Sequence, residues 1–299
     1  MSLRATTGPW TLKDWPKDFC TRFYQTFIRT QLINNSSCQV TKRISYLSEA
    51  ELLKTTNVLR NFYNYILHHS VCPEFNEQIY AARNICDIAD RELFRVGVVG
   101  SRLPDSLNTA VSRLHGGRYA KIFSNDQTWN GAENLGGSER DSEDIVHAAI
   151  AALGTNEQRQ KISEAVQASL IYEEEMSFEV AGVERADEKA QAEHEALVCA
   201  KPHLRLLGKL HCSRWTYPLA PRFPLSDEAK RRQQDEQEFT LWVEDEVLEY
   251  CFNGMKIEGK VCELDNGVKW LDSIRAVSPS FFELLPNEFY AKQKALQRE

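Results

Sequence analysis

Residues 61–93 read NFYNYILHHSVCPEFNEQIYAARNICDIADREL, and this stretch decides most of what the sequence predicts about the fold. Apolar residues recur at helical spacing on both sides of Pro73. Proline fits the first turn of a helix, because its missing N–H has no intrahelical partner there. Since the connection between the two periodic segments is short, we expect them to form an antiparallel helical hairpin.

Both helices of this hairpin carry recognisable signals. Ser48 and Glu51 fit a capping box that begins the first helix, which we expect to run to about His68. Gly97 and Gly100 are expected to end the second helix. The apolar stripe of the second helix follows a 4-3-4-3-4 spacing and consists of Phe75, Ile79, Ala82, Cys86, Ala89 and Leu93. Ala81, Ile85 and Ile88 widen that stripe, so the helix is predicted to be largely buried.

After the hairpin, the sequence pattern changes from helical to strand-like towards the C-terminus. Helical patterns at 104–114, 143–153, 156–172 and about 184–199 precede three runs typical of strands, at 239–243, 247–252 and 256–264. Asn253-Gly254 and Asp265-Asn266-Gly267 are turn signals. The predicted class is therefore α+β, with a mainly helical body, an antiparallel helical hairpin core and a small C-terminal antiparallel β section.

The organisation follows from these patterns. Residues 1–44 form a basic, aromatic segment in which Phe19, Phe23 and Phe27 recur at helical spacing, and we expect it to dock on the body. Residues 45–200 form the helical body. Residues 201–299 form an α+β section that is expected to pack on the body as one unit.

Charge and cysteine content narrow the classes of function. The net charge of −7 disfavours a nucleic-acid binder that uses its whole surface. The charge is uneven, since residues 1–44 carry seven bases and two acids whereas residues 142–200 carry 13 acids and four bases. An acidic stretch is usually a solvated face, but it also suits a basic protein partner. Eight cysteines without a CxxC pair indicate free thiols in a reducing compartment, and no apolar run is long enough to span a membrane.

A search for catalytic motifs finds no phosphate-binding loop, no nucleophile elbow and no HExxH sequence. His68 and His69 are adjacent, so they point about 100° apart on a helix and do not easily share a metal ion. We interpret them as a structural hairpin end. Arg83 and Asp87 are spaced as an ordinary i, i+4 helix pair. Because their helix is expected to be largely buried, Arg83 and Asp90 could instead anchor a polar network or contact a partner. No cofactor is predicted.

Two alternative functions remain. Cys199, His203, His211 and Cys212 do not match a standard zinc pattern, but they would be the centre of a metal-dependent or thiol enzyme. Residues 10–43 combine basic and aromatic side chains, as in an RNA-binding module. The aromatic residues recur at helical spacing, however, which favours packing.

The hairpin sequence resembles a fungal family, the Argonaute-binding subunit of the Argonaute siRNA chaperone (ARC) complex. The resemblance is specific over about residues 45–95 and weaker over about 240–288, where Asn266–Trp270 and Pro279–Asn287 are similar. The matching positions are Tyr65, His68, His69, Val71, Cys72, Pro73, Glu74, Ala81, Ala82, Arg83, Ile85, Cys86 and Asp87.

The resemblance implies a non-catalytic subunit that binds Argonaute together with a second accessory subunit. It implies contact with duplex siRNA only through Argonaute, restraint of slicing or passenger-strand release, and a role in RNAi-directed heterochromatin assembly in nucleus and cytoplasm. Relatives are expected to carry a longer charged N-terminal extension. The candidate partner-contact positions are Tyr65, His68, His69, Cys72, Pro73, Arg83 and Asp87.

Overall fold

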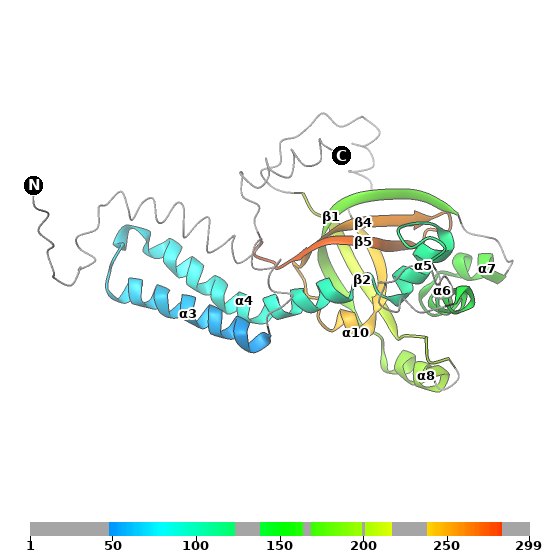
Figure 1. Ribbon diagram of the computed structural model, residues 1–299, viewed down its shortest axis with the longest axis horizontal. Coiled ribbons are helices and arrows are strands. Elements are labelled where there is room, and N and C mark those ends of the chain that lie inside the picture. Colours follow the sequence, from blue (N-terminus) through cyan, green and yellow to red (C-terminus); the bar gives the residue numbers. More distant parts are fainter. Residues whose placement is uncertain (1–47, 123–137, 164–168, 199–200, 217–237, 283–299) are drawn as a thin grey trace, which may run out of the picture. The chain divides into compact units, whose positions relative to one another are not determined.

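A computed structural model describes residues 48–122, 138–163, 169–198, 201–216 and 238–282 (Figure 1). The chain divides into two compact units, residues 1–94 with 281–299 and residues 95–280. We call the described parts of these the hairpin unit and the sheet unit. The N-terminal segment 1–44 and the tail lie outside the described residues. Within the described ranges, no helix is both long and apolar enough to cross a membrane.

The hairpin unit contains the two predicted helices. Helix α3, Glu49–His68, begins with the predicted capping box between Ser48 and Glu51. The 3-10 turn η4, Pro73–Phe75, has proline in its first turn and leads into α4, Asn76–Arg102. The predicted end of α4 at Gly97 and Gly100 is wrong, because the helix continues through both glycines. A small core between the helices is made of Tyr63, Ile66, Ile79, Ala82 and Cys86.

The sheet unit is built on five antiparallel strands in the order β3-β2-β1-β4-β5. Their bounds are β1 Leu170–Glu184, β2 Leu207–Arg214, β3 Glu238–Glu244, β4 Lys256–Leu264 and β5 Lys269–Ser278. β1 is the longest strand, and it pairs with β2 on one side and β4 on the other. The predicted turn at Asp265-Asn266-Gly267 is confirmed as the hairpin that joins β4 to β5.

Among the described residues, five short helices accompany the sheet: α5 Ser106–His115, α6 Glu139–Leu153, α7 Asn156–Ser163, α8 Glu188–Val198 and α10 Asp245–Leu248. Figure 1 shows α5 and α6 next to each other at one end of the sheet. They pack there through Val111, Val146 and Ile150 against Trp270 of β5. The other face of the sheet is buried against the last turns of α4, including Val99, and against α10.

The class α+β is confirmed, but the position of the core and the size of the sheet are not as predicted. The largest buried cluster lies on the sheet and not in the helical hairpin. The sheet also begins much earlier than expected, because the predicted helix at 156–172 ends at Ser163 and β1 starts at Leu170. The predicted strand at 247–252 is wrong, since residues 245–248 form the helix α10.

A buried carboxylate fixes the end of α5 to β5. Asp272, on β5, accepts hydrogen bonds from the Ser112 hydroxyl at 2.6 Å and from the backbone N–H of Arg118 at 3.0 Å. Gly117 lies between these two donors with φ of +144°, and a Cβ added there would lie 2.2 Å from Asp272 Oδ1. The close approach of the turn to the carboxylate therefore requires glycine at position 117.

We expect Gly117→Ala to lower the free energy of unfolding by about 3 kcal/mol, because the methyl group meets the Asp272 carboxylate and the backbone angle is strained. Chemical denaturation of the full chain measures the change. Gly100→Ala is the control, since its Cβ would meet only Val277 at 3.7 Å inside a helix. That variant should be as stable as the parent or up to about 1 kcal/mol more stable. Equal stability of the two variants would contradict the assignment.

Candidate functional site

The turn between α3 and α4 presents a compact exposed surface, which we call the tip surface: Tyr65, His68, His69 and Pro73. The Tyr65 ring lies 4.3 Å from the His69 ring, and the two histidine rings meet edge to face at 4.9 Å. Tyr65 is 49% exposed although it is aromatic. The geometry therefore places an aromatic ring and two imidazoles together at the end of a rigid pair of helices.

The histidines of the tip surface are not buried together with Arg83. Both are exposed, whereas Arg83 is half-buried and donates from Nε to Asn64 at 2.8 Å. Cys72, another predicted contact position, is half-buried. The structure thus separates the seven candidate positions into an exposed tip, a half-buried thiol, and a charged pair, Arg83 and Asp87, along the helices.

That charged pair belongs to a larger set of contacts, which we call the interhelix network. Its members are Thr56, Arg60 and Asn64 on α3 and Arg83, Asp87 and Asp90 on α4. Arg60 is central, because its Nε donates to Asp87 at 2.9 Å and its Nη2 donates to Asp90. Hydrogen bonding to Asp90, and then to Asp87, raises the pKa of Arg60 although desolvation opposes it.

The sequence singled out the three members on α4, Arg83, Asp87 and Asp90, but it did not point to the members on α3. A signal was available, since Thr56, Arg60 and Asn64 recur every four residues and so share one side of α3. The weaker contact in the network is the predicted i, i+4 pair, with Arg83 Nη1 at 3.7 Å from Asp87 Oδ2. Contacts between the helices at 2.8 and 2.9 Å are shorter.

The predicted metal or thiol cluster is not assembled by the described residues. Cys199 lies outside them. His211 and Cys212 are neighbours on β2, so their side chains point to opposite faces of the sheet. His211 faces Glu184 at 3.2 Å, while Cys212 is in the core, where burial raises the pKa of its thiol. In the part of the chain that the structure describes, no three His, Cys, Asp or Glu side chains are placed to hold a metal ion.

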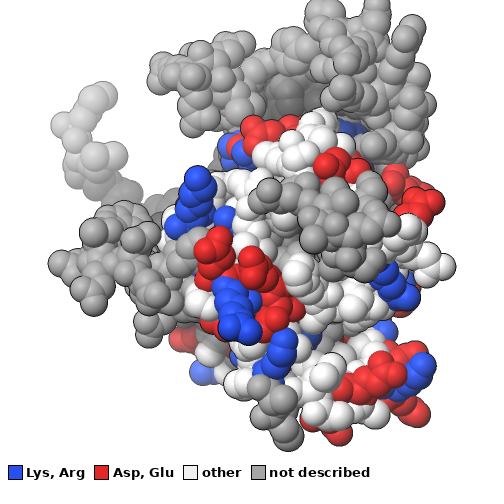
Figure 2. Space-filling view, turned by 90° about the vertical axis from the view of Figure 1, so that its right-hand side faces the viewer, with Lys and Arg blue, Asp and Glu red and all other residues white. Residues whose placement is uncertain are grey.

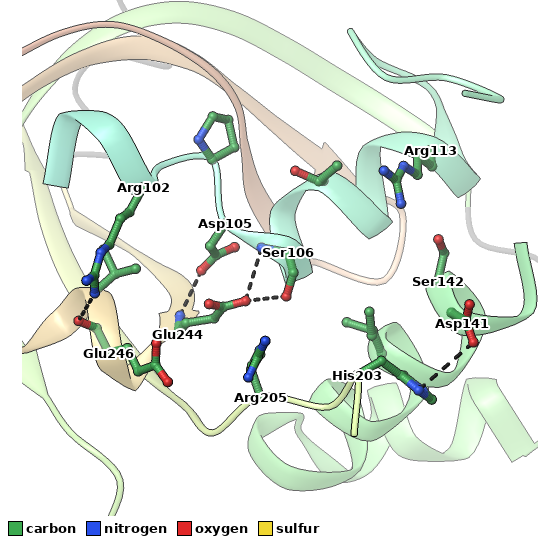
Figure 3. Close-up of a pocket in the computed structure, with 14 residues that line it drawn as sticks. Arg102, Asp105, Ser106, Arg113, Asp141, Ser142, His203, Arg205, Glu244 and Glu246 are labelled. Carbon is green, nitrogen blue, oxygen red and sulfur yellow. Dashed lines mark hydrogen bonds and ion pairs between the residues drawn. The ribbon is translucent and has the colours of Figure 1, made fainter. Parts of the chain in front are cut away.

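A pocket of about 500 Å³ with many ionisable side chains in its lining lies in the sheet unit, and no sequence motif pointed to it. Figure 3 shows basic side chains on several walls, with Arg113 on α5 and Arg205 pointing into the pocket from opposite sides. Its charged lining residues are Arg102, Arg113, His203, Arg205, Asp105, Asp141, Glu244 and Glu246.

Several of the pocket carboxylates have structural partners. Asp105 accepts from the backbone N–H of Asn108 at 2.9 Å and from the N–H of Glu244 at 2.7 Å, so it caps α5 and ties it to β3. Glu244 accepts from the Ser106 N–H at 3.1 Å, and Asp141 completes the capping box of α6 with Ser138. These carboxylates hold helix ends in place. The pocket therefore does not resemble a catalytic site with an acid and a base group that are free to react.

The Asp105 carboxyl is buried, and its ionisation is coupled to folding. Desolvation by burial, with repulsion from Glu244 in second place, raises the pKa of Asp105 from 3.8 to about 6, although N–H donors from Asn108 and Glu244 oppose the rise. Asn108 extends the contact by donating to the Trp242 carbonyl at 3.1 Å and accepting from the Leu271 N–H at 2.7 Å. The position of α5 on the sheet therefore depends on Asp105 and Asn108.

The acidic middle of the chain does not form a patch of one sign. On β1, Glu173 meets Lys260, Glu174 meets Arg214 and Glu175 meets Arg275, each at 2.6 Å. Figure 2 shows acidic and basic side chains side by side on one face of the molecule. Bases from β2, β4 and β5 thus pair with the three consecutive glutamates of the acidic stretch, so this part of it is a mixed-charge sheet surface.

The structure defines an α+β protein whose sheet carries paired acidic and basic side chains and whose helical hairpin has an exposed aromatic and histidine tip. A sequence model of the family described as "Argonaute siRNA chaperone (ARC) complex subunit Arb1" matches residues 36–296. The chain belongs to this family, which confirms the resemblance seen in residues 45–95.

A curated relative is the protein named Argonaute-binding protein 1 from Schizosaccharomyces pombe. It is 23% identical over 256 residues, which cover 80% of this chain and 58% of the relative. The chain therefore spans little more than half the length of that relative. No solved structure matches the chain.

Removal of Arg60 tests the interhelix network. Arg60→Ala leaves two carboxylates near each other without their shared cation, so we expect the free energy of unfolding to fall by about 1–3 kcal/mol. Arg91→Ala is the matched control, because Arg91 is exposed and its Nε donates to the Asp87 carbonyl within its own helix. A double-mutant cycle with Asp90→Ala measures the coupling directly. A coupling energy near zero would contradict the assigned contact.

The raised pKa of Asp105 predicts a pH dependence. Because the folded protein holds this proton more tightly than the unfolded chain, its contribution is most favourable below about pH 4 and is lost as pH rises towards and beyond 6. We define the stability difference as the free energy of unfolding of the parent minus that of Asp105→Asn. This difference should therefore fall by about 2–3 kcal/mol between pH 4 and pH 7. Urea denaturation at both pH values measures it. A difference that is constant or grows with pH would contradict the burial effect.

Proposed function

We propose that this chain is a non-catalytic subunit of an Argonaute siRNA chaperone complex and that it binds Argonaute. The observation that carries the proposal is the family match over residues 36–296, which includes all of the residues that the structure describes. The name of the S. pombe relative supports Argonaute as the partner. Since that relative is longer than this chain, activities of the whole relative enter here only as part of the proposal.

We place the Argonaute contact at the tip surface. An aromatic ring beside two imidazoles offers apolar contact area, hydrogen-bond donors and hydrogen-bond acceptors within one small region. Because Tyr65, His68 and His69 belong to the last turn of α3 and its cap, little conformational freedom is lost when a partner binds them.

The finer role follows the implication of the family. The chain acts with a second accessory subunit on Argonaute loaded with duplex siRNA, and it meets the RNA through Argonaute. It restrains slicing or passenger-strand release in RNAi-directed heterochromatin assembly, and it works in nucleus and cytoplasm. Acidic and basic side chains lie next to each other on the face in Figure 2, which fits contact with a protein better than contact with phosphates. Binding of phosphates requires clustered bases.

A binding experiment with the purified full chain and Argonaute from the same organism tests the proposal. We expect association with a Kd in the micromolar range or below. Replacement of Tyr65, His68 and His69 by Ala should weaken it at least tenfold, with little change in stability because all three side chains are exposed.

Leu197→Ala is the control, because it removes a similarly exposed apolar side chain from α8 in the sheet unit. Its affinity should equal that of the parent. Absence of binding between two folded proteins would contradict Argonaute binding. Equal binding by the triple variant and the parent would contradict only the placement at the tip surface.

A further inference from the structure

One side of α3 carries exposed apolar side chains. Val58 is 67% exposed and Phe62 is 36% exposed. Both are two positions away from Arg60, and residues two apart on an α-helix point in nearly opposite directions, about 200° around the axis. Because Arg60 is held against α4 by the interhelix network, Val58 and Phe62 must lie on the opposite side of the hairpin.

Helix α4 adds apolar side chains to that same side. Ile85 is two positions after Arg83, and Ile88 is two positions before Asp90, so both point away from the interhelix network. Both isoleucines are half-buried. We call Val58, Phe62, Ile85 and Ile88 the apolar face of the hairpin unit. It continues at one end to Tyr65 of the tip surface.

The hairpin unit therefore has a polar side and an apolar side. The interhelix network covers the polar side, and the small core lies between the helices. A contiguous exposed apolar surface beside a bundle core is typical of a surface that another element covers. A third amphipathic helix would complete such a two-helix unit.

We propose that residues 10–32 of the same chain cover this apolar face. Phe19, Phe23 and Phe27 are spaced four residues apart, so a helix in this segment would present them on one side. The charges are complementary. Residues 10–32 carry four basic and two acidic side chains, whereas residues 48–94 carry seven acidic and four basic ones.

The chain length allows this arrangement. Fifteen residues, 33–47, connect the aromatic segment to Ser48, and they span up to about 50 Å when extended. Helix α3 has 20 residues and is about 30 Å long. The segment can therefore lie along α3 in either direction. The aromatic segment precedes the family match, which starts at residue 36, so the inference does not depend on the Argonaute proposal.

Site-specific photocrosslinking in the full chain tests the inference. A benzoylphenylalanine replacing Phe62 is expected to form an adduct within the same chain to a peptide from residues 10–32, identified by mass spectrometry. The matched control replaces Tyr80, an exposed aromatic residue of α4 that lies away from the apolar face. This control position should give at least fivefold less of the same adduct.

A second variant supports the assignment without altering the apolar face. Replacing Phe19, Phe23 and Phe27 by Glu should reduce the adduct from position 62 at least fivefold. An adduct between two chains at position 62 would show a second copy as the occupant and overturn the inference. Adducts only to other parts of the chain, adducts that need added Argonaute, or no adduct to residues 10–32 would overturn it as well.

Discussion

The ion pairs from Arg60 to Asp87 and Asp90 determine which side chains of the hairpin unit reach solvent. Apolar packing between α3 and α4 is not directional, so it tolerates small rotations of one helix against the other. A guanidinium that meets two carboxylates on the facing helix restricts that rotation, because its hydrogen bonds require defined geometry. With the rotation fixed, Val58 and Phe62 face outward.

The sheet unit uses buried carboxylates in a comparable way. Asp105 and Asp272 each accept hydrogen bonds from α5 or the turn after it, and Asn108 bonds to backbone groups of two strands. Since an unsatisfied buried polar group costs about 1–3 kcal/mol, α5 has little freedom to move on the sheet. The pocket beside α5 is therefore lined in part by a residue that positions this helix, Asp105.

The sequence was sufficient to predict the elements that depend on local signals. The capping box at Ser48, the turn at Pro73 and the glycine turn before β5 are short-range patterns, and the structure confirms each of them. Strand β1 was missed because Glu173, Glu174 and Glu175 are consecutive and hide the alternation of a strand. Their partners Lys260, Arg214 and Arg275 are distant in sequence, so only the fold shows why these carboxylates are tolerated there.

The candidate site shows the same limit. The family resemblance identified Tyr65, His68, His69, Cys72, Pro73, Arg83 and Asp87, but it did not distinguish exposed positions from structural ones. That distinction depends on how α3 is rotated, which is set by Arg60. Arg60, which no sequence motif singles out, thus determines which neighbouring side chains are exposed and which are structural.

Hydroxyl-radical footprinting of the Argonaute complex is the most direct test of the central claim that the tip surface is the binding site. It measures the solvent accessibility of individual side chains with and without the partner. If the tip surface is the binding site, Tyr65, His68 and His69 lose reactivity towards hydroxyl radicals in the complex, while Leu197 keeps it. Protection confined to residues 95–280, with the tip residues as reactive as in the free chain, would contradict it.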